Sequence, residues 1–146
     1  MKAALVRFAR CRRGASAVEF AIIAVPLFLL LFGIIEFSRA MWIREAISQT
    51  AIAAARCVGI PQSQCAADGA YDEKRTVAFV EAKAKGWYIT LAPASISIDT
   101  AASCSGVSGF TRITLNYTFR SVVPELLTVM SGPIQLSASA CFPNHS

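Results

Sequence analysis

Charged residues are scarce in this chain of 146 residues, and histidine is nearly absent. Charged side chains make up 16% of the sequence and hydrophobic ones 55%. This composition excludes disordered, collagen-like and low-complexity proteins, because those classes contain too few large apolar residues. It is also more apolar than an ordinary soluble domain. The length allows one domain, or one domain together with a membrane segment.

Acidic residues are missing from the first 14 positions, which hold all of the excess positive charge. The formal net charge is +5, and the rest of the chain is neutral. A nucleic-acid-binding protein spreads its cations over a folded face or groove. A short tail offers no such surface, so nucleic acid is not an expected partner. The basic residues of the tail are Lys2, Arg7, Arg10, Arg12 and Arg13.

The sequence also lacks the patterns of common catalytic and cofactor sites. The single histidine, His145, lies at the end of the chain, and no nucleophile and base can be grouped around it. No phosphate-binding glycine loop or dinucleotide fingerprint occurs, and the cysteines lack Cys-x2-Cys spacing. We therefore expect no enzyme activity, no cofactor and no metal site.

A long apolar run follows the basic tail. Residues 15–35 read ASAVEFAIIAVPLFLLLFGII and contain one charged residue, Glu19. At ~1.5 Å per residue this run forms a helix of roughly 32 Å, about the thickness of a bilayer's hydrocarbon layer. Positive charge in short flanks stays cytoplasmic, so the N-terminus is expected inside and the C-terminal region outside. A cleaved signal peptide is the alternative, although Ser38-Arg39-Ala40 is a poor cleavage site.

Glu19 is the most informative residue of the run. A carboxylate in a membrane is costly unless it is neutral or paired, so such a residue usually has a partner. The alternative is that Glu19 lies shallow, at the headgroups, with its charge in water. Gly14 lies five residues before Glu19, directly after Arg12-Arg13, and Phe20 follows it. The stretch RRGASAVEF thus combines basic residues, a glycine and an acid at close spacing.

This stretch resembles the processing site of type IV prepilins and pseudopilins. Those proteins carry a basic leader, a glycine before the cleaved bond, a glutamate at the fifth mature position and an apolar helix. The resemblance implies that a prepilin peptidase cleaves between Gly14 and Ala15, which makes Glu19 the fifth residue and Phe20 the sixth. Cleavage removes the leader and creates an α-amine, a partner for Glu19 of a neighbouring subunit. Ala15 departs from the Phe or Met of many type IV pilins, whereas Phe20 suits the Flp-type branch.

The wider segment is similar to the N-terminal domain of TadE-like proteins, minor pseudopilins of the Tad (Flp) pilus machinery. The similarity covers roughly residues 14 to 56, with matching pieces at Val18-Glu19-Phe20-Ala21, Pro26 and Gly33-Ile34-Ile35-Glu36. It implies a membrane-anchored pseudopilin-like protein in the assembly of a Tad/Flp type IV pilus or a related secretion system. The implied partners are prepilin peptidase, other pilin or pseudopilin subunits, Tad machinery proteins and inner-membrane lipid. The implied location is the bacterial inner membrane, as a single-pass protein with a periplasmic C-terminal domain.

A second function is also compatible with the sequence. An unprocessed single-pass membrane protein would use its extracytoplasmic domain as a binding module for a ligand or for peptidoglycan. Removal of the leader distinguishes the two functions, because only a processed prepilin loses residues 1–14.

Small residues recur along one side of the apolar helix. Glu19, Pro26, Gly33 and Ala40 are spaced by seven residues, so they lie near one face that drifts by about 20° per step. Small residues favour close contact between membrane helices, and Pro26 can bend the helix. We predict that this face packs against another protein. Chance alignment in an alanine-rich segment is the alternative.

Hydrophobic periodicity predicts two helices. The spacing of the first helix continues to about residue 56, and Gly59-Ile60-Pro61 ends it. Residues 57–71 have the composition of a loop. Asp72 is suited to cap a second helix that runs to about Lys85 and ends at Gly86.

The remainder of the chain has the composition and alternation of strands. The candidate strands are residues 87–91, 95–99, 113–119 and 134–139, with a short helical piece around residues 125–130. The predicted fold class is therefore α+β and pilin-like. A long N-terminal transmembrane helix precedes a small extracytoplasmic domain with one helix and a sheet of three or four antiparallel strands. The predicted divisions are 1–14 (leader), 15–56 (membrane helix and its extension) and 57–146 (periplasmic domain).

Four cysteines lie beyond the apolar run: Cys57, Cys65, Cys104 and Cys141. Cys11 precedes the run and is lost if the leader is removed. An even number of cysteines on the predicted outer side favours disulfides, because that compartment is oxidising. Three pairings are possible, and free thiols are the alternative. We favour Cys57–Cys65, which closes a short loop, and Cys104–Cys141, which links two strand regions.

Overall fold

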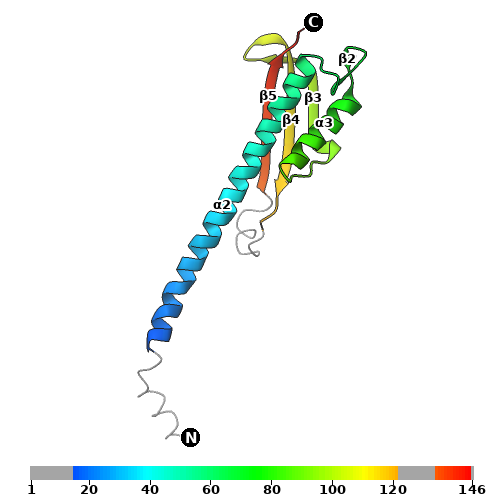
Figure 1. Ribbon diagram of the computed structural model, residues 1–146. Helices are drawn as coiled ribbons and strands as arrows, with labels where there is room; N and C mark the ends of the chain where they lie inside the picture. The colour runs from blue at the N-terminus through cyan, green and yellow to red at the C-terminus, as the bar shows by residue number, and fades with distance from the viewer. Residues whose placement is uncertain (1–14, 122–133, 146) are drawn as a thin grey trace, which may run out of the picture. The chain divides into compact units, whose positions relative to one another are not determined.

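The computed structural model of the protein describes residues 15–121 and 134–145. The chain divides into two compact units, Met1–Phe37 and Ser38–Ser146. Figure 1 shows the order of the elements along the chain. The predicted leader and the predicted helical piece at residues 125–130 lie outside the described residues.

Helix α2 (Ala15–Gly59) is continuous, with Pro26 in its interior. It ends three residues later than predicted, shortly before Pro61, whose ring does not fit a helix interior. The residues of α2 beyond Ser38 contribute much of the core of the second unit. Alanines are prominent in this half of the helix, because their small side chains let a helix pack closely against a sheet. The buried residues of this half include Ile43, Ala46, Ile47, Ala51, Ala54 and Ala55.

Helix α3 (Glu73–Gly86) begins at Asp72, as predicted. The carboxylate of Asp72 accepts a hydrogen bond from the backbone amide of Arg75 at 2.9 Å, which satisfies one of the free amides at the helix start. Val80 and Ala84 are buried on one face of the helix. The charged residues of α3 lie on the opposite, exposed side, so its amphipathic pattern matches its environment.

The main sheet has three antiparallel strands in the order β3-β4-β5. Its strands are β3 (Ile96–Cys104), β4 (Val107–Phe119) and β5 (Ile134–Pro143), and the short 3-10 helix η2 (Pro93–Ser95) leads into β3. Strand β4 is central and its alternation explains the two faces of the sheet. Ile113 and Leu115 are fully buried, whereas the intervening polar residues face outward.

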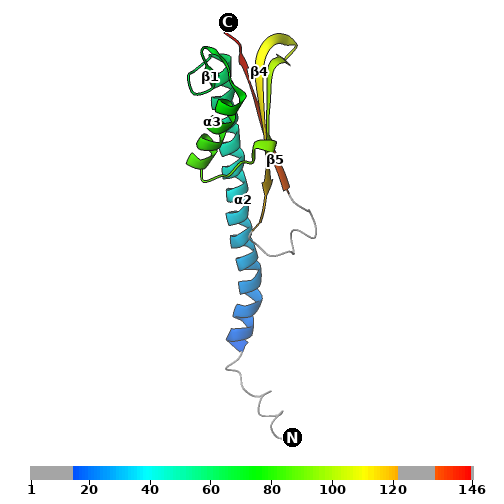
Figure 2. The same cartoon turned by 90° about the vertical axis from the view of Figure 1, so that its right-hand side faces the viewer.

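Helices α2 and α3 cover one face of this sheet within the second unit (Figure 2). Each of the three strands contributes apolar side chains to the core beneath the helices. Cross-strand pairs such as Ile113 with Ala140 and Leu115 with Ala138 lie on this inner face. The opposite face is polar, and Thr118 and Gln135 are hydrogen-bonded there at 3.0–3.1 Å. The α+β fold class predicted from the sequence is therefore confirmed, with three strands in the main sheet.

Two local predictions were wrong. Residues 87–91 do not form a strand. They form a turn and an irregular segment after α3, in which Ile89 and Leu91 are buried. The predicted loop at residues 57–71 contains a two-stranded hairpin of β1 (Ala66–Ala67) and β2 (Ala70–Tyr71). Its turn residues Asp68 and Gly69 have φ values of 51° and 79°, as a two-residue hairpin turn requires.

The C-terminal end of α2 touches the end of β5 at Gly59. The carbonyl of Gly59 accepts a hydrogen bond from the amide of His145 at 2.8 Å. A Cβ atom at Gly59 would lie 2.7 Å from Cδ1 of Phe142 and 2.9 Å from the carbonyl oxygen of Pro143. Glycine is therefore required here by close approach of the last strand to the helix.

We predict that Gly59→Ala destabilises the protein by about 1–3 kcal/mol, because the added methyl group forces Phe142 and Pro143 to move. The matched control is Gly86→Ala, because no heavy atom lies within 4 Å of a Cβ at Gly86. That control is expected to be neutral or stabilising by up to ~1 kcal/mol. Urea denaturation of the detergent-solubilised full chain, followed by circular dichroism, measures both changes. Equal stabilities of the two variants would contradict the close approach.

Candidate functional site: the apolar segment of helix α2 and the linked domain

Residues 15–37 of helix α2 form the apolar segment, and its large hydrophobic side chains are exposed. Its large hydrophobic residues from Val18 to Phe37 have exposed fractions between 45% and 70%. Only 6% of the most apolar stretch of the helix is buried. The core helix of a soluble protein would be mostly buried. By length and composition, α2 is suited to cross a membrane once, which fits a single-pass anchor.

The residues of the predicted processing site lie at the start of this segment. Ala15 is the first residue of α2, and Gly14 lies just outside the described residues. Glu19 and Phe20 are both exposed in the following turn. Ala15 and Glu19 are four residues apart in a helix, so they share one face. An acid and the predicted new N-terminus therefore belong to the same patch of helix surface.

On the predicted packing face, Gly33 is accessible to another helix, whereas Ala40 already packs within the second unit. No heavy atom lies within 4 Å of a Cβ built on Gly33, so the helix surface there is bare. Pro26 interrupts the backbone hydrogen bonding of the same segment. Ala40 is half-buried and packs against the core of the second unit. The part of the face that is available to another helix therefore consists of Glu19, Pro26 and Gly33, and its packing stays a prediction.

Arg39 links the first turn of the second unit to the end of the sheet. Its Nη2 donates a hydrogen bond to the carbonyl oxygen of Arg120 at 2.6 Å. Its guanidinium group also lies 4.8 Å from the ring centroid of Phe119. The interaction of a cation with an aromatic face is favourable. Sequence reasoning missed this contact, because nothing local relates Arg39 to residues 80 positions later.

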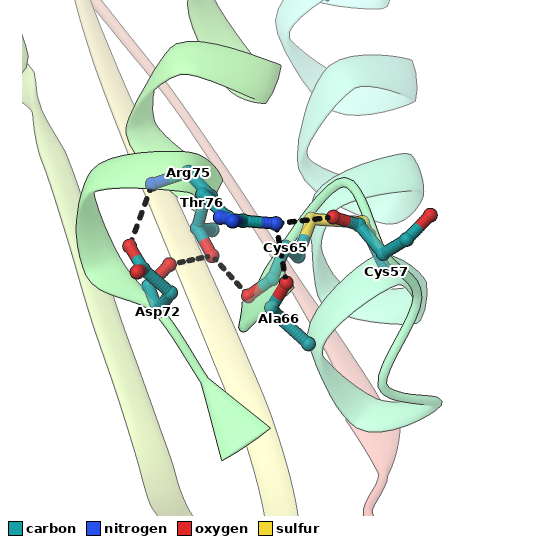
Figure 3. Close-up of a disulfide and its surroundings, with 7 residues drawn as sticks. Cys57, Cys65, Ala66, Asp72, Arg75 and Thr76 are labelled. Atoms are coloured by element: carbon teal, nitrogen blue, oxygen red, sulfur yellow. Dashed lines mark hydrogen bonds between the residues drawn. A yellow bond between two sulfur atoms is a disulfide. The ribbon is translucent and has the colours of Figure 1, made fainter. Parts of the chain in front are cut away.

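The disulfide Cys57–Cys65 joins the last turns of α2 to the loop before β1, with Cα atoms 5.9 Å apart. Both cysteines are 1% exposed. Figure 3 shows this disulfide beside the start of α3. The bridge therefore closes the short loop that the sequence favoured, and it does so in a buried position.

Side chains from α3 hold the same loop by hydrogen bonds (Figure 3). The guanidinium group of Arg75 donates to the carbonyl of Ala66 at 3.0 Å. The buried hydroxyl of Thr76 lies 2.8 Å from the carbonyl of Asp72 and 3.3 Å from that of Cys65. The carbonyls of Cys65 and Asp72 also accept backbone hydrogen bonds from the amides of Asp72 and Thr76, each at 3.0 Å, so the hydroxyl of Thr76 adds a second donor to each. The loop is thus fixed from two sides, by a covalent bond and by α3.

Tyr71 adjoins this cluster and has a raised pKa. Partial burial raises the pKa of its hydroxyl above the ordinary value of 10.0, and the negative charges of Glu73 and Asp72 raise it further. All three causes favour the neutral phenol. Tyr71 therefore stays uncharged beside the capping carboxylate of Asp72 throughout the neutral pH range.

The disulfide Cys104–Cys141 links the two outer strands of the sheet, with Cα atoms 6.5 Å apart. The pairing of β3 with β4 has two register shifts between Asp99 and Cys104, so the ladder is irregular close to this disulfide. Gly109, with a φ of 87°, lies on β4 within the second irregularity. Arg112 of β4 donates a hydrogen bond to the carbonyl of Ser103 and contacts the sulfur of Cys104 at 3.6 Å. Both bridges match the pairing favoured from the sequence.

The surface of α3 carries a shallow, open groove lined by residues that include Ser63, Arg75, Phe79, Lys83 and Trp87. Lys83 lies over the ring of Phe79, 5.5 Å from its centroid. No group of three His, Cys, Asp or Glu side chains within residues 15–121 and 134–145 is arranged to hold a metal ion.

A family model described as TadE-like protein matches residues 14–56. This match confirms the resemblance found in the sequence, over less than a third of the 146 residues. It coincides with the apolar segment and the part of α2 that packs on the sheet. The match indicates a membrane protein associated with the Tad pilus. Nothing among the curated proteins or the solved structures matches this chain.

We predict that a mild thiol reductant opens Cys104–Cys141 before Cys57–Cys65. Reduction requires a thiolate to reach a sulfur atom, and Cys141 is exposed whereas Cys57 and Cys65 are each 1% exposed. Timed alkylation of the solubilised protein, followed by peptide mass spectrometry, gives the order. In denaturant the two bridges are expected to open at similar rates. Earlier opening of Cys57–Cys65 in the folded protein would contradict the burial argument.

The packing face predicts selective crosslinking at Gly33. In a Cys11→Ser background, Gly33→Cys is expected to form a disulfide dimer in oxidised membranes, because small residues mark the closest helix contact. Leu31→Cys and Ile35→Cys, two residues before and after Gly33, point to the opposite side of the helix and are expected to crosslink several-fold less. Non-reducing gel electrophoresis measures the dimer fraction. Equal crosslinking at the three positions would show that this face has no preferred contact.

Proposed function

We propose that this chain is a membrane-anchored, pseudopilin-like subunit in the assembly of a Tad/Flp type IV pilus or a related secretion system. Helix α2 anchors it in the bacterial inner membrane, with a cytoplasmic N-terminus and a periplasmic second unit. Prepilin peptidase removes residues 1–14. The mature protein then associates through its apolar segment with other pilin or pseudopilin subunits or with Tad machinery.

The observation that carries this proposal is the exposed apolar helix that begins with the ASAVEF motif. Its large hydrophobic side chains from Val18 to Phe37 are exposed, and the TadE-like match spans it. A free helix of this kind requires lipid or other helices around it. The basic residues before Gly14 support a cytoplasmic N-terminus.

The chemistry proposed for assembly is charge pairing in a medium of low dielectric constant. Cleavage after Gly14 creates an ammonium group at Ala15, close to the membrane surface. Glu19 is exposed on the same helix, so its carboxylate is accessible to the ammonium group of an adjacent subunit. Such a pair offsets the cost of holding either charge in the apolar layer. The pair thus favours association of processed subunits over unprocessed ones.

The two disulfides support an extracytoplasmic second unit. All four of its cysteines are paired, Cys57 with Cys65 and Cys104 with Cys141. Disulfides persist in oxidising compartments such as the periplasm and are rare in the cytosol. The covalent links also suit a domain that must stay folded while it is handled by assembly proteins.

The second candidate function is an unprocessed membrane protein whose periplasmic unit is a binding module. The groove along α3 is the feature that favours it, because Arg75 and Phe79 supply a cation and an aromatic ring at one place. The groove is open and shallow, so it encloses no small molecule. An intact leader on the mature protein would favour this alternative.

We predict that coexpression with a prepilin peptidase yields a chain that begins at Ala15. Gly14→Leu is expected to block cleavage at least tenfold, because the peptidase must approach the backbone closely at a small residue. Gly33→Leu introduces the same bulk inside the apolar segment and is expected to leave cleavage unchanged. Mass spectrometry of the intact purified protein distinguishes the two forms.

Glu19→Gln separates processing from assembly in the same experiment. This variant is expected to be cleaved but to co-purify several-fold less with other pilin or pseudopilin subunits, because the charge pair is lost. Detection of an intact leader on the wild-type chain in the presence of active peptidase would refute the proposed function.

A further inference from the structure

The C-terminal end of helix α3 has the hydrogen bonds of a Schellman motif. The amide of Tyr88 donates to the carbonyl of Lys85 at 2.9 Å, and the amide of Ile89 donates to the carbonyl of Ala84 at 3.0 Å. Trp87 is the C-cap, and Tyr88 follows it with a φ of 59°. Glycine is the usual residue at this position, because a Cβ atom is strained at positive φ. Tyr88 therefore holds a position that favours glycine.

Tyr88 is the bulky exception among the described residues with positive φ. The other non-glycine residues of this kind, Asp68 and Ser105, are small and polar. Each precedes a glycine in a tight hairpin turn, where such residues are tolerated. An aromatic residue has no comparable local hydrogen bond to compensate for the strain. The backbone of α3 thus offers no reason for tyrosine at residue 88.

Packing within the second unit offers no reason either. The side chain of Tyr88 is 98% exposed, so folding buries almost none of its ring. The apolar contact that accompanies a Schellman motif is made by its neighbour Ile89, which lies with Ala84 in the core. A strained residue whose ring is almost entirely exposed is a candidate for a contact beyond the described residues 15–121 and 134–145.

Tyr88 directly follows Trp87, which contacts Trp42. The ring of Trp87 meets the ring of Trp42 edge-on, with centroids 5.5 Å apart and planes at 71°. Trp42 belongs to helix α2 and is 56% exposed. The aromatic patch is defined here as Trp42, Trp87 and Tyr88. Lys85, in the last turn of α3, is exposed next to it in the chain.

The aromatic patch is close to the apolar segment along the chain. Trp42 follows Phe37, the last residue of that segment, by five residues within helix α2. At ~1.5 Å per residue this separation is about 7–8 Å along the helix. The headgroup layer on each side of the hydrocarbon is roughly 5–8 Å thick. A tryptophan this few residues beyond an apolar run is suited to the headgroup layer, and Trp87 contacts Trp42.

We propose that the aromatic patch is a lipid-contact surface, in which Trp42, Trp87 and Tyr88 lie among the headgroups of the membrane that holds the apolar segment. Rings with one polar edge favour this layer. Lys85 adds a cation on a flexible stem that reaches lipid phosphates. The proposal rests on the membrane anchoring proposed above. It accounts for an aromatic residue at a position where the backbone favours glycine.

The first test measures the depth of each tryptophan. The chain has two tryptophans, so Trp42→Phe leaves Trp87 as the single fluorophore and Trp87→Phe leaves Trp42. Each full-length variant is reconstituted in vesicles of phosphatidylcholine and phosphatidylglycerol that carry a nitroxide either on the headgroup or at the end of an acyl chain. The headgroup nitroxide is expected to quench each tryptophan at least about twofold more strongly than the chain-end nitroxide.

Flotation of the same vesicles separates failure of this proposal from failure of the anchoring. Protein that floats with the vesicles while neither tryptophan is quenched by the headgroup nitroxide overturns the lipid contact and leaves the anchoring intact. Protein that does not float overturns both. A tryptophan that is quenched more strongly by the chain-end nitroxide also overturns the proposed depth.

The second test uses Tyr88→Gly in the Trp42→Phe background. Removing the strain at residue 88 is expected to raise the Tm by about 2–6 °C. Loss of the ring is expected to reduce quenching of Trp87 by the headgroup nitroxide at least about twofold. Because the variant is more stable, unfolding cannot explain the loss. A lower Tm would contradict the strain argument and overturn the proposal.

Tyr88→Phe is the matched control, because it keeps both the ring and the strained backbone. It is expected to retain at least three quarters or so of the quenching of Trp87, since the ring supplies most of the contact. Unchanged quenching in Tyr88→Gly overturns the role of Tyr88 at the lipid surface. Loss of co-purifying subunits in Tyr88→Gly, with quenching unchanged, would assign the patch to a protein partner and likewise overturn the proposal.

Discussion

The apolar side chains of residues 16–37 must leave water, and the described part of the chain does not cover them. Transfer of one large aliphatic or aromatic side chain out of water contributes about 1.5–3 kcal/mol. With more than a dozen such residues exposed between Val18 and Phe37, the total is tens of kcal/mol, far above the stability of a folded domain. Lipid or neighbouring helices have to supply this environment. Any function of the protein must therefore be compatible with an apolar environment around residues 16–37.

The same helix changes its packing partner along its length. From Ile43 onward its buried face is rich in alanine and lies against the inner side of the sheet. Thr50 is buried on this face, and its hydroxyl donates a hydrogen bond to the carbonyl of Ala46 in the same helix, at 2.7 Å. The hydroxyl therefore needs no water as a partner. One continuous element therefore serves both as the apolar anchor and as the central part of a folded core. Gly59 ends this element where the last strand crosses closely over it.

Sequence periodicity predicted the elements that have one wet and one dry face. Strand β4 and helix α3 follow the spacing of their apolar residues, and Asp72 caps α3 as expected. The hairpin β1–β2 was missed because its strands have only two residues each, too few to alternate. The Asp68-Gly69 dipeptide was the available signal. Residues 87–91 were misassigned because aromatic and β-branched residues favour strands, whereas their backbone is set by the end of α3.

In the candidate site, too, features made by residues close in the sequence could be predicted, whereas contacts between residues far apart in the chain could not. The spacing of Gly14, Ala15 and Glu19 is local, so the sequence alone predicts a processing motif there, and it stays a prediction. The contacts of Arg39 with Arg120 and of Trp42 with Trp87 join residues far apart in the chain. No pattern of spacing encodes such pairs, because they depend on the way the sheet and helices pack. Disulfides are intermediate, since the number of cysteines limits the pairings but does not choose among them.

A single membrane helix fixes the position of its domain only in part. The apolar length makes the helix long enough to span the bilayer, but a helix surrounded by lipid tilts at a modest cost. Association with other subunits then selects one orientation of the domain, and the rotational freedom lost in this step opposes association. An aromatic contact away from the helix axis, such as the proposed lipid contact of Trp87 and Tyr88, removes part of that freedom before assembly begins. The strain held at Tyr88 is in this view a small loss of domain stability that is exchanged for a defined orientation at the membrane.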